Sequence, residues 1–220
     1  LVGVMPCNET DNVLLATRDG KAIRFGVDAV RVFRGRDSTG VRGIRLLGND
    51  RVVSMSVIND DANQFILSVT ENGYGKRTPV DDYWRSGRGG QGVANIETSP
   101  RNGKVMASFA VVDDDQLMLV TNMGQVIRIR VHGGDGDSIR IASRKTQGVR
   151  LFDVADDDNE KVVSAGLVRE TDDDEEAASA EGEVSESAGD ALAPNVSDMA
   201  SEDIKAETPG RADPTEDTPA

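Results

Sequence analysis

The stretch VLLATRDGKAIRF (residues 13–25) returns twice along the chain, as FILSVTENGYGKRT (65–78) and LMLVTNMGQVIRI (117–129). Each copy is an apolar run, then Thr, two residues and Gly, with an arginine four residues further on. The glycines are Gly20, Gly73 and Gly124, spaced 53 and 51 positions apart, and the arginines are Arg24, Arg77 and Arg128. A Thr-x-x-Gly segment between apolar runs is typical of a β-hairpin whose glycine takes a positive φ. The sequence therefore predicts three hairpins in repeats of about 52 residues.

When the three repeats are aligned with one another, two further columns of equivalent residues follow each hairpin. The segments RDSTGV (36–41), RGGQGV (88–93) and RKTQGV (144–149) superpose, so that Arg36, Arg88 and Arg144 each stand four residues before Gly40, Gly92 and Gly148. The apolar runs DRVVSMSVI (50–58), GKVMASFAV (103–111) and EKVVSAGLV (160–168) form the last column. Residues 87–92, GRGGQG, have the G-x-G-x-x-G spacing of a dinucleotide-binding turn. In the equivalent loops GRDSTG and SRKTQG of the other repeats, only the last glycine and the arginine recur, so we reject a nucleotide site.

The repeats predict an all-β fold of four-stranded blades, propeller-like or a β-pinwheel, with about three blades in this chain. The alternation is clearest in VIRIRV (126–131), where we expect Ile127, Ile129 and Val131 to face inward and Arg128 and Arg130 outward. No segment predicts a buried helix. We expect blades at 12–63, 64–115 and 116–169, and the end of a preceding blade at 1–11.

Charge separates the last part of the chain from the repeats. Residues 170–220 hold 17 acidic and 2 basic residues and no aromatic residue, while residues 1–169 hold 22 acidic and 23 basic residues. Such a segment cannot bury enough apolar surface to offset the entropy of ordering, so we predict a disordered acidic tail. The tail either competes with nucleic acid for basic side chains of the repeats or only aids solubility.

The sequence offers no catalytic or metal site. The single cysteine, Cys7, and the single histidine, His132, have no partners of metal-ligand type, and no hydrolase, Walker or zinc-protease motif occurs. We assign Asp113–Asp115 and Asp156–Asp158 to turns, and Tyr83 and Trp84 to packing at a blade edge rather than to stacking on a base. With no apolar run long enough to span a membrane and no signal peptide, we expect a cytoplasmic protein.

Basic residues return at equivalent positions in every repeat. Arranged around an axis, they would place cations at intervals along a rim, where phosphate contacts give affinity for duplex DNA without reading its sequence. The alternative is a protein-binding propeller whose arginines pair with Asp81, Asp82 or Asp113–Asp115 of neighbouring blades. The candidate DNA-binding residues are Lys21, Arg24, Arg36, Arg42, Arg45, Lys76, Arg77, Arg85, Arg88, Arg128, Arg130, Arg144 and Lys145; the turn glycines are Gly20, Gly40, Gly73, Gly92, Gly124 and Gly148.

The segments GKAIRF, STGVRGIRL, NGYGKRT, GRGGQGV and KTQGV closely resemble the C-terminal domain of the A subunit of bacterial DNA gyrase, over roughly residues 1–169. The resemblance implies a six-bladed β-pinwheel in which neighbouring blades exchange a strand, with about the last three blades and the acidic tail in this chain. It also implies that the surface wraps double-stranded DNA for strand passage. The implied partners are the B subunit, together with the rest of the A subunit, in a heterotetramer that introduces negative supercoils.

The resemblance has departures. The family's box Q-R-R-G-G-[RK]-G is absent, and RSGRGGQG (85–92) only echoes it, with Gln91 where a basic residue would stand. The active-site tyrosine and the ATPase site belong to regions not present, so ATP and Mg²⁺ are expected only in the parent topoisomerase and this chain should not be catalytic. The A-type subunit of topoisomerase IV, which carries a similar domain with more degenerate repeats, is the near alternative.

Overall fold

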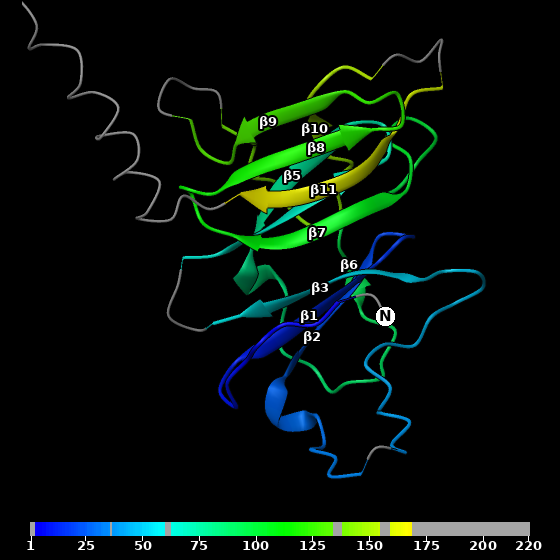
Figure 1. Cartoon of the computed structure of the whole chain (residues 1–220), viewed down its shortest axis with the longest axis vertical. Coiled ribbons are helices and arrows are strands. Elements are labelled where there is room, and N and C mark those ends of the chain that lie inside the picture. Colours follow the sequence, from blue (N-terminus) through cyan, green and yellow to red (C-terminus); the bar gives the residue numbers. More distant parts are fainter. Residues whose placement is uncertain (1–2, 36, 60–62, 134–137, 155–158, 169–220) are drawn as a thin grey trace, which may run out of the picture. The chain divides into compact units, whose positions relative to one another are not determined.

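The structure is a computed structural model that describes residues 3–35, 37–59, 63–133, 138–154 and 159–168. Within these ranges the chain forms strands and two single-turn 3-10 helices, which confirms the all-β prediction (Figure 1). The strands are β1 (Asn12–Thr17), β2 (Lys21–Gly26), β3 (Val52–Ile58), β4 (Phe65–Thr70), β5 (Tyr74–Pro79), β6 (Val93–Ala94), β7 (Val105–Val111), β8 (Gln116–Thr121), β9 (Val126–Arg130), β10 (Val149–Arg150) and β11 (Val162–Val168); the 3-10 helices are η1 (Val27–Ala29) and η2 (Val80–Asp82).

Several expectations concern parts of the chain without described strands. Residues 3–8, expected to end a preceding blade, form no regular structure. The predicted acidic tail at 170–220, the Asp156–Asp158 run and Arg36 lie outside the described residues. The fold described below belongs to the unit formed by residues 1–175.

Each Thr-x-x-Gly segment forms the predicted hairpin turn. The turns join β1 to β2, β4 to β5 and β8 to β9, all antiparallel. Gly20, Gly73 and Gly124 have φ of 84°, 75° and 85°, a region that favours glycine. The threonine hydroxyl also contributes, because Thr17 Oγ1 accepts a hydrogen bond from the backbone N–H that follows the turn, as Thr121 Oγ1 does in the third repeat.

Each of the first two sheets takes its outer strand from the following repeat. The strand orders are β3-β1-β2-β6, β10-β5-β4-β7 and β11-β8-β9. Strand β6 of the second repeat pairs with β2 of the first, and β10 of the third repeat pairs with β5 of the second. The strand exchange expected from the resemblance is therefore confirmed. Strand β9 has β8 as its neighbour and no second one among the described residues.

The opposite edges of the sheets adjoin one another. Strand β7 contacts both β3 and β11, so these three strands form the inner edge of the array. Strands β6 and β10 lie at the opposite edges of their sheets, which we call the outer edge. Apolar side chains fill the seams between sheets. One cluster joins the first two repeats and includes Leu14, Ile58, Ile66 and Tyr83. A second joins the next two repeats through Leu67, Val111, Leu117, Leu119 and Val162.

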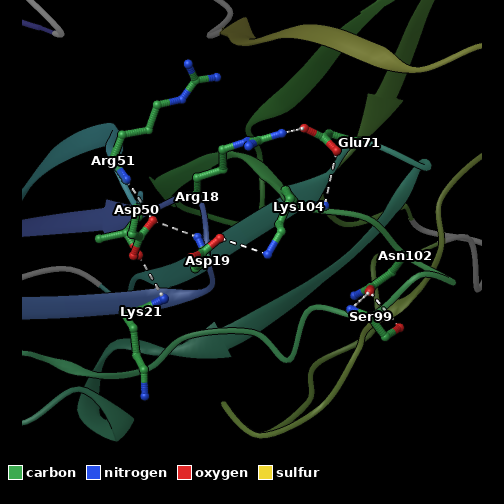
Figure 2. A network of polar contacts seen from close by, with 10 residues as sticks. Arg18, Asp19, Lys21, Asp50, Arg51, Glu71, Ser99, Asn102 and Lys104 are labelled. Atoms are coloured by element: carbon green, nitrogen blue, oxygen red, sulfur yellow. Dashed lines mark hydrogen bonds and ion pairs between the residues drawn. The ribbon is translucent and has the colours of Figure 1, made fainter. Parts of the chain in front are cut away.

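Polar contacts join the first two repeats beside the hairpin turns (Figure 2). The guanidinium of Arg18 lies 3.0 Å from Glu71, and the ammonium of Lys104 lies 2.8 Å from Asp19. The backbone N–H of Val105 donates to the Arg18 carbonyl at 2.9 Å. Basic side chains at this end of the seam therefore already contact carboxylates.

Candidate nucleic-acid interface

The outer strands are held by glycines at points of close backbone approach. Gly92 and Gly148 precede β6 and β10 and have φ of 71° and 79°. A Cβ added to Gly92 would lie 2.3 Å from the Ala22 carbonyl oxygen, and one added to Gly148 would lie 2.7 Å from that of Gly75. Gly40, the third member of this column, has φ of 79° but no atom within 4 Å of the same position. The recurring glycine thus serves the strand exchange itself.

The arginines four residues before Gly92 and Gly148 each bind a carbonyl of the preceding repeat. Arg88 Nη1 donates to the Arg42 carbonyl at 3.2 Å, and Arg144 Nη1 donates to the Ala94 carbonyl at 3.1 Å. Arg42 and Ala94 hold the same position, two residues after the loop glycine. Arg88 Nε also donates to the Ala29 carbonyl at 2.9 Å. In both described copies, this column connects consecutive repeats through backbone oxygens.

The arginine column after the hairpin turns also has structural contacts. Arg24 Nη1 reaches the carbonyls of Val80 and Tyr83, each at 3.3 Å. Arg77 is only 3% exposed; its Nε donates to the Ile139 carbonyl at 2.7 Å and its guanidinium forms an ion pair with Asp113. Arg77 and Asp113 belong to the same repeat, so this ion pair is not the pairing between neighbouring blades that the protein-binding alternative proposed.

Lys76 and Arg77 were expected at a DNA-facing rim, and this expectation is wrong because both side chains are buried. Five of the six residues of β5 are buried, since neighbouring repeats cover both faces of the sheet. The period-2 rule for an exposed face does not apply to such a strand. By contrast, β9 alternates as predicted, with Arg128 and Arg130 exposed and Val131 buried.

Lys76 has a buried ammonium that donates to the carbonyl oxygens of Ser143 and Arg144. Burial, together with repulsion from Arg144, lowers the pKa of Lys76 to about 8. Because this pKa is below the ordinary value of 10.5, the buried charge costs stability fully below pH 8. Between pH 8 and pH 10.5 the folded state has lost this proton while the unfolded state still holds it, so the destabilisation caused by the buried charge falls as the pH rises.

Replacing Lys76 with methionine should therefore flatten the pH dependence of stability. We expect the free energy of unfolding of the unmodified chain to rise relative to that of Lys76→Met between about pH 8 and pH 10. Urea unfolding of both proteins across this range measures the difference. Lys21→Met, at an exposed lysine, should show no such divergence. Parallel curves for Lys76→Met and the unmodified chain would contradict the buried charge.

The exposed cations gather in the loops beside the outer strands. The loops around residues 42–45 and 85–91 lie side by side, since Arg45 N–H donates to the Gly90 carbonyl at 2.7 Å. Lys21 and Arg45 line a hollow of about 200 Å³, which also contains the carboxylates of Asp19 and Asp50. Among the predicted residues, the exposed ones here are Lys21, Arg42, Arg45, Arg85, Arg88 and Lys145, of which Arg85 pairs with Asp28 at 2.6 Å.

Two further arginines at the outer edge were not among the candidates predicted from the sequence. Arg101 and Arg150 both reach the hydroxyl of Tyr74, at 3.3 and 3.2 Å, and both stack near its ring. These hydrogen bonds lower the pKa of Tyr74, and the bond from Arg150 has the larger effect. Arg150 also pairs with Asp153. Arg101 has no counterpart in the recurring columns, so repeat comparison gave no signal for it.

The two aromatic residues assigned to packing behave differently. Tyr83 is 1% exposed, and its hydroxyl donates to Asn95 Oδ1 at 2.6 Å; burial raises its pKa. Trp84 is 57% exposed, so packing is confirmed for Tyr83 and wrong for Trp84. Within the described ranges, His, Cys, Asp and Glu side chains form no group suited to a metal ion, and no helix is long and apolar enough to cross a membrane.

Comparison with known proteins assigns the repeats to one family. The family model described as "DNA gyrase C-terminal domain, beta-propeller" matches residues 11–59, 64–111 and 115–169. The A subunit of DNA gyrase from Salmonella typhimurium is 42% identical over 194 residues, covering 88% of this chain, and that from Rickettsia bellii is 36% identical over 217 residues, covering 78%. The chain spans 21% and 23% of the lengths of these relatives.

Solved structures share the fold. The C-terminal domain of a DNA topoisomerase IV superposes with a TM-score of 0.67 at 25% identity, covering 79% of this chain and 51% of that one. A DNA gyrase A C-terminal domain gives 0.64 at 24% identity, covering 74% and 52%. The hairpins, the strand exchange, and the three segments that the family model matches lead to one conclusion: this chain belongs to the DNA gyrase C-terminal domain family of β-propellers.

Proposed function

We propose that this chain binds duplex DNA along the outer edge of its sheets and bends it around the array. The observation that carries the proposal is the gathering of exposed cations beside the outer strands. Phosphate contacts of this kind hold DNA without reading its sequence, and a curved row of them favours a bent duplex. The contacts we assign to phosphate are Lys21, Arg42, Arg45, Arg85, Arg88, Lys145 and Arg150.

Within a larger protein, we propose that the bound segment is presented to a type II topoisomerase of the gyrase class, which introduces negative supercoils at the expense of ATP. The partners would be the B subunits, together with the rest of the A subunit, in a heterotetramer associated with the nucleoid in the cytoplasm. The chain itself would be non-catalytic, with ATP and Mg²⁺ used elsewhere. A topoisomerase IV protein is the near alternative, since the two solved domains have similar TM-scores; the identities to gyrase A sequences favour gyrase.

A protein-binding propeller is the second candidate, and the structural role of Arg88 and Arg144, which join consecutive repeats, favours it. Substitutions in the arginine columns do not decide between the two functions. Charge reversal at Arg88 or Arg144 would break hydrogen bonds between repeats and so destabilise the fold on either hypothesis. Arg45 and Lys145 are better probes, because both are exposed and neither has a carboxylate partner among the described residues.

Neutralising Arg45 and Lys145 together should weaken DNA binding and reduce its salt dependence. Each lost phosphate contact lowers the slope of log K against log salt by about 0.9, so we expect a drop of about 1.8 for Arg45→Gln with Lys145→Gln. The matched control is Arg51→Gln with Lys161→Gln, which removes the same charge at the starts of β3 and β11 on the inner edge. A salt titration against a duplex of about 40 base pairs measures both.

The control pair should leave the slope unchanged. An equal drop for both pairs would mean that only net charge matters, which would remove the proposed surface. If the unmodified chain is folded and fails to bind the duplex at low salt, the proposed function itself is wrong.

We also propose that the acidic segment at 170–220 competes with DNA for these cations. Its 17 acidic and 2 basic residues give it the charge to do so. Truncation before Glu170 should then raise affinity for the duplex at low salt, and unchanged affinity would leave the segment only a solubilising role.

A further inference from the structure

Trp84 is a large apolar side chain left open on the surface between two cationic loops. It is the only tryptophan of the chain, and it follows η2 in the connection that leads to β6. With Asp82, Ser143, Arg144 and Lys145 it lines a shallow hollow of about 300 Å³. The hollow therefore combines residues of the second and third repeats beside the outer strands.

One face of the indole rests against a cation that is fixed in place. The Arg144 guanidinium lies 4.8 Å from the Trp84 ring and 5.9 Å from the Tyr83 ring, and its Nη1 is hydrogen-bonded to the Ala94 carbonyl. The buried Lys76 binds the carbonyls of Ser143 and Arg144, so the loop beneath is anchored as well. A ring supported in this way is preorganised for contact with a ligand on its open side.

We propose that Trp84 contacts wrapped duplex DNA through the sugars and base edges, while Lys145 binds the adjacent phosphate. This inference rests on the proposed function. Surfaces that bend DNA often set an apolar side chain against base steps, because partial unstacking makes the bend less costly. The flanking cations of Arg144 and Lys145 match the charge of a DNA backbone, whereas the carboxylate of Asp82 opposes it. In the equivalent connection of the third repeat, Arg140 takes the place of Trp84, so the contact belongs to one seam of the array.

The intrinsic fluorescence of Trp84 tests the contact directly, because no other tryptophan contributes. The 220-residue chain is titrated with a duplex of about 40 base pairs at low salt. Anisotropy of a labelled duplex gives the affinity, and Trp84 emission and its quenching by acrylamide give the environment of the indole. We expect emission to change with the same midpoint as anisotropy, and acrylamide quenching to fall on binding.

Two variants separate a contact from a packing role. Trp84→Ala should weaken binding about fivefold or more, since aromatic contacts to bases contribute about 1–3 kcal/mol. Its slope of log K against log salt should stay unchanged, because the indole neutralises no phosphate. Trp84→Phe, which keeps an aromatic ring over Arg144, should retain most of the affinity. Met123→Ala, at an exposed apolar side chain in the β8–β9 turn, is the matched control and should bind normally.

The outcomes distinguish this inference from the proposed function. If the unmodified chain binds the duplex but its Trp84 emission and acrylamide quenching do not change, the Trp84 contact is wrong and the proposed function stands. Normal affinity of Trp84→Ala would overturn the contact in the same way. A reduced salt slope in Trp84→Ala would mean that the ring only positions Arg144 and Lys145, which also overturns it. If the folded unmodified chain shows no binding by anisotropy, both the contact and the proposed function are wrong.

Discussion

Replacing Arg77 with alanine should lower the free energy of unfolding by about 3 kcal/mol, a large fraction of the roughly 5–15 kcal/mol that stabilises a typical domain. The substitution removes the ion pair with Asp113 and the hydrogen bond to Ile139, and it leaves that carbonyl without its donor in the interior. It also empties the space that the side chain fills against the Phe65 ring, 5.1 Å away. Urea unfolding followed by circular dichroism measures the change.

The third repeat provides the matched control. Arg128 holds the position equivalent to Arg77, but its side chain is exposed on β9 and donates to Gln116. Arg128→Ala should therefore cost less than about 1 kcal/mol. Similar losses at the two positions would mean that the burial of Arg77 between repeats is not the source of its effect.

Replacing Gly148 with alanine should destabilise the chain by about 3 kcal/mol. A side chain at positive φ costs about 1–2 kcal/mol, and overpacking against the Gly75 carbonyl, 2.7 Å from the new Cβ, adds a similar amount. The loss should be local before it is global, because Gly148 seats β10 on β5. Hydrogen exchange of the Leu151 amide, which donates to the Gly73 carbonyl, should speed up in the variant.

Gly40 separates the two costs. It has φ of 79°, the same as Gly148, but an added Cβ there would meet no atom within 4 Å. Gly40→Ala should show the conformational cost alone, about 1–2 kcal/mol. If Gly40→Ala and Gly148→Ala lose the same stability, close approach of the backbones contributes nothing, and the explanation of this glycine column by strand exchange fails.

The repeats predicted the hairpins because a local signal specifies them. A Thr-x-x-Gly turn needs only a positive φ and a hydroxyl that meets a nearby backbone group, and both are encoded within a few residues. The all-β class and the outward arginines of β9 follow from the same local alternation, and the structure confirms them. The six recurring turn glycines likewise all have positive φ.

The strand exchange and the buried cations could not be predicted from these patterns. Strands β6 and β10 have two residues each, too few for a periodicity to show which sheet they join. Once they are in place, neighbouring sheets cover β5 on both faces, and residues that alternation would expose, such as Lys76 and Arg77, become interior. Repetition of a basic residue therefore indicated a recurring role without showing that the role was to hold repeats together.

The open position of Trp84 had a different cause. Its neighbour Tyr83 turns into the seam and is buried, and two adjacent residues of an extended segment point to opposite sides. A packing role for one of the two thus argued against it for the other. The sequence pattern did not show which of the two rings would face inward.

The borrowed outer strands also set the order in which the protein is completed on the ribosome. The three strands that the first repeat supplies to the first sheet are complete once Ile58 is synthesised, but the fourth strand, β6, is complete only at Ala94. The second sheet likewise lacks its fourth strand, β10, until Val149 and Arg150 are synthesised. At about 5–20 residues per second, the interval between Ile58 and Ala94 lasts several seconds. From the synthesis of β3 until that of β10, the nascent chain carries a sheet with an unpaired edge, the kind of surface that pairs with other chains. Each new repeat closes the edge left by the one before it and opens its own.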